Sequence, residues 1–432
     1  MGKEKVLIVL ILILGLGLRL VNLNQSLWLD EAAQAVMSEK SVDEIWSARQ
    51  ADFHPPLFYI LAHYWIQVNR LEIWLRLLPV MFGVISIGLI YLLAGRNKFG
   101  LLSAFFLAIN PYHIYYSQEF RSYSMLAMLG LLSMLFLKQK KYIFMAVTNT
   151  LILYTHYSGM FLILAQILIR PITIPYLLVP IALYSPWILK FAEQLRSGVN
   201  IDSYLPGWRN VLTLSPAKAI PEIIFKFMAG RINLMPKWIY AIYIIFVLGV
   251  TSAGIFLNRL ERKFLWVWLG IPILVSFILS FWIPQTQPFR LLYCLPALIM
   301  IMAGAATKFP KTFITLMVYI SVVGNVLYFT RPRLQREQWR QAIDFMRMQN
   351  VTVVVKFFDK FAPFYWYDPN LKVVTSDKVT SDMKKFWYME YLTGLTDPAK
   401  LTQKKLEAGG WKITDTKNFE GVGLIYKYES RN

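Results

Sequence analysis

Two carboxylates open the first long polar stretch of this sequence, and their position points to acid–base chemistry. Asp30 and Glu31 directly follow an apolar run of about the length that spans a bilayer. A carboxylate at the mouth of a cavity can accept the proton of a hydroxyl or amine as that group attacks an activated carbon. The two side chains lie about 100° apart around a helix, so one is predicted to act directly while the other orients it or holds a cation. The alternative for Asp30 is structural, because aspartate is among the best helix N-caps.

An aspartate and a histidine close the same polar stretch. His54 follows Asp52 by two residues and precedes two prolines, and proline restricts both its own backbone and that of the residue before it. This rigidity suits a side chain held as a ligand or hydrogen-bond donor in the neighbourhood of a substrate. Glu31, Asp52 and His54, together with Asp30, could also hold a divalent metal ion, although one loop without an established ligand spacing is a weak metal signal. No other cofactor is expected.

Two arginines lie where apolar runs are expected to end on the outer side of a membrane. Arg121 lies in NPYHIYYSQEFRSYSM, close to Tyr123, and Arg290 lies in QTQPFRLLY. An arginine near a bilayer is costly unless it is paired or meets an anion, so both are predicted to bind the phosphate of a lipid-linked substrate. The alternative is that they only reach toward lipid headgroups. His156, in YTHYSG, lies at another such end and is either structural or part of the substrate site.

The composition defines the frame that has to position these residues. Of 432 residues, 56% are hydrophobic and only 16% are charged, and the mean hydropathy is +0.46. These values exclude an ordinary soluble domain and indicate a polytopic membrane protein. The formal charge of +20 does not require nucleic acid, because basic residues concentrate in cytoplasmic turns and near anionic headgroups. The single cysteine, Cys294, excludes an intrachain disulfide and a multi-cysteine metal site.

About eleven apolar runs alternate with basic turns, as expected of transmembrane helices. The first, Val6 to Val21, has no small-residue cleavage site after it and is interpreted as an uncleaved span with a cytoplasmic N-terminus. Every short turn rich in lysine or arginine then lies on the cytoplasmic side of the cell membrane. The other spans are expected at residues 73–93, 101–115, 123–137, 142–154, 157–169, 172–190, 239–257, 264–282, 291–306 and 312–329. These spans make residues 1–330 a transmembrane module.

The first outer loop, residues 22–72, is expected to carry helices that lie on the membrane surface. Ser41 and Glu44 form a capping box, which predicts short helices at about 31–39 and 42–50. A further apolar piece at 56–67 is too short for a full span and is predicted to be half-embedded.

The second outer loop and the C-terminal segment share the outer side with the acidic pair. The loop, residues 191–238, contains an amphipathic piece near 220–228. An odd number of spans leaves residues 331–432 outside, where a helix-like stretch is followed by strand-like runs at 351–355 and 421–428. This segment is predicted to be a small extracytoplasmic α/β domain.

As a set, these motifs resemble the membrane glycosyltransferases of the GT-C class. The acidic pair after the first span, then DFHPPLFY, YYSQEFRSYSM, YTHYSGMF, FRLLYCLPAL and REQWRQAIDFM, occur in the order and spacing seen in that class. The sequence looks most like the branch of protein O-mannosyltransferases and bacterial aminoarabinose transferases, from the first span to about Met346. The resemblance implies a polyprenyl- or dolichyl-phosphate-linked sugar donor, an extracytoplasmic site and inversion at the anomeric carbon. It also implies that Asp30 matches the catalytic aspartate and Glu31 its neighbour.

Phe53 and His54 depart from the aminoarabinose transferases, which carry a glutamate and a lysine before the paired prolines. The pattern here is closer to the O-mannosyltransferases, but the C-terminal segment lacks their β-trefoil insertion. The expected function is therefore transfer of a sugar from a lipid-phosphate donor to an acceptor protein, lipid or glycan of the cell envelope, with Asp30 as the general base. The alternatives are a transporter or lipid flippase with an outer sensor domain, which predicts charges at mid-membrane, and a structural scaffold, which leaves the acidic loop unexplained.

Overall fold

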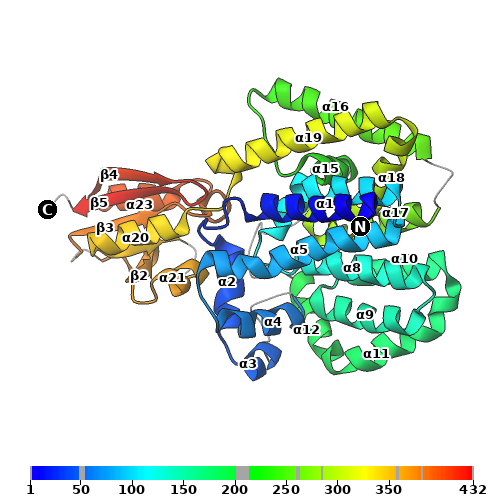
Figure 1. The fold of residues 1–432 in the computed structure, drawn as a ribbon. Coiled ribbons are helices and arrows are strands. Elements are labelled where there is room, and N and C mark those ends of the chain that lie inside the picture. Colours follow the sequence, from blue (N-terminus) through cyan, green and yellow to red (C-terminus); the bar gives the residue numbers. More distant parts are fainter. Residues whose placement is uncertain are drawn as a thin grey trace.

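The computed structural model describes residues 2–47, 54–200, 214–258, 263–283, 286–356, 360–380 and 383–430. A large helical body is joined to a small sheet domain formed by the C-terminal residues, and helix α2 (Leu29–Ser38) lies where the two meet (Figure 1). Asp52 and the predicted end of the second interfacial helix at residue 50 lie outside the described residues.

The helical body contains the predicted spans. Its helices are α1 (Lys3–Leu20), α5 (Glu72–Ala94), α6 (Lys98–Ile109), α7 (Pro111–Ser117), α8 (Tyr123–Lys138), α9 (Tyr142–Thr155), α10 (Gly159–Ile169), α11 (Leu178–Tyr184), α12 (Ile188–Val199), α15 (Pro216–Ala229), α16 (Lys237–Asn258), α17 (Lys263–Leu279), α18 (Leu295–Lys308) and α19 (Pro310–Thr330). Within the described residues, five continuous helical stretches are long and apolar enough to cross a membrane, and the other apolar helices are shorter. A polytopic membrane protein is confirmed, while the number of eleven spans stays a prediction.

The predicted span at 101–115 is not one straight helix. It divides into α6 and α7 at Asn110 and Pro111, because proline has no N–H to continue the helical ladder. The Asn110 side chain is the N-cap of α7 and accepts a hydrogen bond from the His113 backbone N–H at 2.8 Å. This break turns the segment after α7 back toward the first helix, where the Gln118 side chain donates to the carbonyl of Arg19 at 3.0 Å.

The first loop contains three short helices, α2, α3 (Val42–Ser47) and α4 (Leu57–Ile66), close to the predicted bounds, while their location at the membrane surface stays a prediction. The capping box is present, since the Glu44 carboxylate accepts from the Ser41 N–H at 2.9 Å and the Ser41 hydroxyl accepts from the Glu44 N–H at 3.3 Å. In the second outer loop, α15 occupies the predicted amphipathic piece and packs against α7, α16 and α19.

The C-terminal domain is a five-stranded mixed sheet with strand order β2-β1-β3-β5-β4. Its strands are β1 (Val353–Val355), β2 (Val373–Thr375), β3 (Lys385–Met389), β4 (Trp411–Phe419) and β5 (Gly423–Ser430), and its helices are α20 (Trp339–Gln349), α21 (Ala362–Tyr367), α22 (Thr393–Thr396) and α23 (Leu401–Ala408). Both strands predicted from the sequence are present as β1 and β5. Side chains alternate along β3, so Trp387 and Met389 face the core under α20 while Phe386 and Tyr388 face the core that includes Leu406 of α23.

Candidate functional site

Asp30 lies on the first turn of α2 and faces a cavity. Trp28 is the N-cap residue of this helix, so Asp30 is the second helical residue and the N-cap alternative for it is wrong. Its carboxylate makes no hydrogen bond to another described residue, while its backbone carbonyl accepts from Arg121 at 3.3 Å. The Asp30 carboxylate therefore does not cap its own helix, and it lies in the wall of the cavity.

Glu31 has a different environment from its neighbour. It is fully buried, and its Oε1 accepts from Arg76 Nε at 3.0 Å and from the Phe120 backbone N–H at 2.7 Å. Its Oε2 meets the Arg76 guanidinium in the same ion pair. Burial by itself raises the pKa of this carboxyl, but the charges of Arg76 and Arg336 and these hydrogen bonds outweigh it, so the pKa lies below its usual value. Glu31 thus ties α2 to α5 and to the segment after α7.

Arg121 brings together two histidines from distant parts of the chain. It is buried, and its Nη2 lies 3.4 Å from His54 Nε2. The rings of His54 and His156 are 5.3 Å apart, edge to face. Burial, followed by the neighbouring His54, Arg290 and Arg121, lowers the pKa of His156 well below its usual value, so its imidazole is neutral. The structure therefore places these three predicted residues in one cluster beside Asp30.

Arg290 and Tyr123 complete the predicted set. Arg290 lies on the 3-10 turn η3 (Pro288–Cys294), whose carbonyl at Arg290 accepts from the Ser158 hydroxyl at 2.6 Å. Its guanidinium lies 5.8 Å from the Phe289 ring centroid, and Phe289 in turn packs 5.0 Å from Tyr123. Arg290 is close enough to Asp30 and Arg121 for their charges to interact. The structure thus brings the two arginines within range of each other's charge, while their convergence on a bound phosphate stays a prediction.

The cavity in front of Asp30 has a volume of about 130 Å³. Its walls combine aromatic rings with charged groups: Trp28, Asp30, Tyr112, Tyr116, Glu119, Tyr123, Lys226, Arg231, Gln287, Pro288 and Phe289. Within the described part of the chain, the buried indole N–H of Trp28 has no hydrogen-bond partner. A buried donor without a partner is costly, and this N–H lies beneath the cavity wall.

A second set of charges next to the cavity was not identified from the sequence. Arg336 and Glu119 form a buried ion pair at 2.7 Å, and the guanidinium carbons of Arg336 and Arg231 lie 3.8 Å and 4.6 Å from the Tyr115 ring centroid. Arg336 begins the REQWRQAIDFM motif, which was noted without a role for its arginine. Arg231 follows Gly230, whose φ of +83° turns the chain after α15; the cost of an arginine near a membrane, applied to the second outer loop, would have identified it.

The metal hypothesis stays a prediction with fewer candidate ligands. No three His, Cys, Asp or Glu side chains come together in the part of the chain that the structure describes, and Asp52 lies outside that part. Glu31 fits the role of a metal ligand poorly, because both of its oxygens are engaged by Arg76 and Phe120.

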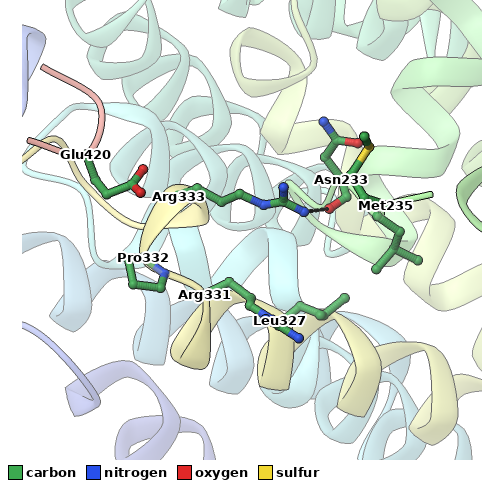
Figure 2. A pocket seen from close by; sticks show the side chains of 8 residues that line it. Asn233, Met235, Leu327, Arg331, Pro332, Arg333 and Glu420 are labelled. Carbon is green, nitrogen blue, oxygen red and sulfur yellow. Dashed lines mark hydrogen bonds between the residues drawn. The ribbon is translucent and has the colours of Figure 1, made fainter. Parts of the chain in front are cut away.

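A second, larger cavity of about 410 Å³ lies between α19, the loop before α16 and the turn between β4 and β5. We call it the seam cavity; Figure 2 shows Arg331, Arg333 and Glu420 at its edge with Met235 and Leu327. Arg333 donates to the Asn233 carbonyl at 3.2 Å. Both arginines are exposed, and none of the residues predicted for the site lines this cavity.

Comparison with known proteins shows the fold. The structure matches ArnT from Cupriavidus metallidurans bound to undecaprenyl phosphate with a TM-score of 0.59 and 11% identity, covering 100% of this chain and 99% of that chain. It matches the Archaeoglobus fulgidus oligosaccharyltransferase tethered with an acceptor peptide with a TM-score of 0.56 and 10% identity, covering 99% of this chain and 74% of that one. No protein-family model and no curated protein matches the sequence. Both structural neighbours are GT-C glycosyltransferases.

Proposed function

We propose that this chain, which has a GT-C fold, is a glycosyltransferase that moves a sugar from a polyprenyl-phosphate donor to an extracytoplasmic protein, lipid or glycan, with inversion. The observation that carries the proposal is the Asp30 cavity, where an available carboxylate faces tyrosines and Arg231 while Arg121 and Arg290 lie beside it. The undecaprenyl phosphate bound to ArnT is a ligand of the chemical class that such a site requires.

Displacement at the anomeric carbon uses the groups of this site in separate roles. The Asp30 carboxylate takes the proton of the acceptor hydroxyl or amine, and the acceptor oxygen or nitrogen forms a bond to the anomeric carbon. The bond from that carbon to the phosphate oxygen breaks on the opposite face, and the lipid phosphate leaves with the electron pair. Arg121 and Arg290 stabilise the charge on the departing phosphate. Because attack and departure occur on opposite faces, the configuration inverts.

The cavity walls offer contacts for the sugar. Tyr123 and Trp28 provide ring faces against which a sugar can pack. Arg231 and Lys226 add positive charge to the same cavity, partly offset by Glu119. We assign Arg231 to the donor together with the two predicted arginines.

A divalent ion at Asp52 and His54 is a separate proposal. Chelation of the purified protein tests it: loss of turnover restored by Mg²⁺ or Mn²⁺ supports the ion, and unchanged turnover at excess chelator contradicts it.

The transporter alternative is disfavoured by the location of the ion pairs. Glu31 pairs with Arg76, and Glu119 with Arg336. These pairs join α2, the start of α5, the segment after α7 and the residues before α20, which are the ends of the body that face the C-terminal domain (Figure 1). A transport pathway requires charged groups at the membrane midplane instead.

Sugar transfer by the purified protein tests the proposed function. The protein is incubated with a labelled polyprenyl-phosphate sugar and a panel of acceptor peptides, lipids and glycans. We expect label to move to one acceptor class or, without an acceptor, to water. Binding of the donor with no release of polyprenyl phosphate under any condition would contradict the proposal.

The proposed orientation places the N-terminus in the cytoplasm and both the site and the C-terminal domain outside the cell membrane. Single cysteines at Lys40, Gln139 and Lys404 report on it, because all three positions are exposed and the native Cys294 is buried. An impermeant thiol reagent added outside is expected to label the first and third but not the second. Labelling of Gln139→Cys alone would overturn this orientation.

A further inference from the structure

The residues just before α20 and its first turn connect the C-terminal domain to the Asp30 site at three points. Arg336 pairs with Glu119, which lines the cavity. Glu337 accepts from the Leu29 backbone N–H at 3.1 Å, one residue before Asp30. Arg340 pairs with Glu72 at 2.9 Å, at the beginning of the helix whose Arg76 holds Glu31. The outer domain therefore contacts each element that fixes the acidic pair.

Glu337 is itself held from several sides by its own domain. Its Oε2 accepts from the Trp339 indole N–H at 2.7 Å, and the Tyr391 hydroxyl donates to the same carboxylate at 3.2 Å. The turn between β4 and β5 closes over it: Gly421 has a φ of +79°, and a Cβ there would lie 2.8 Å from the Glu337 Cγ. The neighbouring Glu420 N–H donates to Gln338 Oε1 at 3.0 Å. The carboxylate thus has a position set by α20, Tyr391 and the β4–β5 turn.

Helix α2 lacks a side-chain cap from its own sequence. The N-cap residue is Trp28, whose side chain makes no capping hydrogen bond, and Glu31 reaches the Trp28 N–H only at 3.5 Å. The first N–H groups of a helix have no partner within the helix, and an acceptor or negative charge at that end is stabilising. Glu337, which lies 308 residues further along the chain, supplies this acceptor to the Leu29 N–H.

We propose that Glu337 is a positioning residue that caps α2 from the C-terminal domain and thereby fixes the Asp30 carboxylate in its cavity. The outer domain is then part of the catalytic unit and not a separate sensor. Two contacts hold the backbone around Asp30: Glu337 at the Leu29 N–H and Arg121 at the Asp30 carbonyl. The effect on turnover rests on the proposed function, while the effect on α2 does not.

Hydrogen exchange of the full-length protein in detergent measures the effect on α2 directly. The variants are Glu337→Ala, which removes the acceptor, and Glu337→Gln, which keeps one carbonyl oxygen. The matched control is Glu407→Ala, an exposed acid on α23. In Glu337→Ala we expect amides at the start of α2 to exchange about fivefold faster, as for loss of an N-cap, while α4 is unchanged. Glu337→Gln is expected to restore most of the protection.

Turnover of the same variants separates positioning from general loss of structure. Glu337→Ala is expected to lower kcat by about tenfold, because a small misplacement of a reacting group is costly, with donor affinity within about twofold of wild type. Unchanged exchange in α2, or faster exchange spread evenly over α2 and α4 with an equal loss of donor affinity, would overturn the inference. Absence of sugar transfer by the wild type would instead overturn the proposed function and leave the exchange result standing.

Discussion

The seam cavity and the Asp30 cavity differ both in size and in what surrounds them. The seam cavity is about three times larger, but its two arginines, Arg331 and Arg333, are exposed to solvent. The smaller Asp30 cavity is lined by aromatic rings and bordered by the buried Arg121 and by the Glu119–Arg336 ion pair. Holding charges out of water requires partners and fixed geometry, which is why we propose the smaller cavity as the site of sugar transfer.

The largest expected effect comes from the carboxylate that only the smaller cavity contains. Asp30→Asn keeps the shape and removes the proton acceptor, so turnover is expected to fall about 100- to 10,000-fold. Donor affinity is expected to stay near wild type, because no contact to the phosphate is lost. Measured kcat and donor Kd check both parts; turnover within about threefold of wild type would shift the role of base away from this residue.

Glu31 is expected to affect folding more than chemistry. Glu31→Ala leaves the Arg76 guanidinium buried without its carboxylate, and breaking a buried ion pair costs about 3–5 kcal/mol. We expect a large fall in melting temperature and in yield of monodisperse protein. The matched comparison is Glu39→Ala, because Glu39 pairs with an exposed Arg70 and such pairs contribute about 0–1 kcal/mol. Equal stability of the two variants would show that the buried pair does not hold α2.

A pH dependence is expected at the contact between α2 and the outer domain. Burial raises the pKa of Glu337 to about 7 from 4.5, and the negative charge of Asp30 adds to this shift while Trp339, Leu29 and Tyr391 donate to the carboxylate. The folded state then binds more protons than the unfolded state between these two pH values. Stability therefore falls as pH rises from about 4.5 to 7, by at most about 3 kcal/mol, and levels off above.

The variant Glu337→Gln does not titrate at this position and provides the reference for that pH dependence. Relative to it, wild type is expected to lose melting temperature across this pH range. A difference between the two proteins that does not change with pH would contradict the raised pKa.

The smallest expected effects, which are also the most specific to one cavity, come from the arginines at the two cavities. Arg121→Gln and Arg290→Gln are each expected to weaken affinity for polyprenyl phosphate about 10- to 100-fold, because a hydrogen bond to a charged group contributes about 1.5–3 kcal/mol. Lysine at either position is expected to restore affinity only partly, since it lacks the planar fork. Arg331→Gln and Arg333→Gln, at the seam cavity, are expected to change it by less than about twofold. Equal losses at both cavities would remove the distinction between them.

The sequence predicted those candidate site residues that can be recognised from their immediate neighbours in the chain. Asp30, His54, Arg121, His156 and Arg290 each lie at an end of an apolar run; the acid–base chemistry of Asp30, the prolines after His54 and the cost of an arginine near lipid were local signals that selected the first three and Arg290. The same reasoning predicted the capping box at Ser41 and Glu44 and the amphipathic piece that forms α15, both of which the structure confirms.

What the sequence did not predict depends on contacts between distant segments. Asp30 and Glu31 are adjacent and chemically alike, yet one faces a cavity and the other is buried in an ion pair with Arg76 of α5, a difference that depends on how α2 is placed in the folded chain. Glu337 was not singled out in the sequence, because its bond to Leu29 exists only when the sheet domain packs on α2. Tertiary packing, not local propensity, assigned these roles.

Photolabelling of the wild-type protein tests most directly which cavity receives the lipid phosphate. A polyprenyl phosphate with a photoreactive group next to the phosphate is bound, irradiated and mapped by peptide sequencing. We predict label in residues 110–124 and 286–294, which border the Asp30 cavity, and competition by unlabelled polyprenyl phosphate. Competed label confined to residues 233–235 and 327–333 would place the lipid phosphate in the seam cavity and contradict the account.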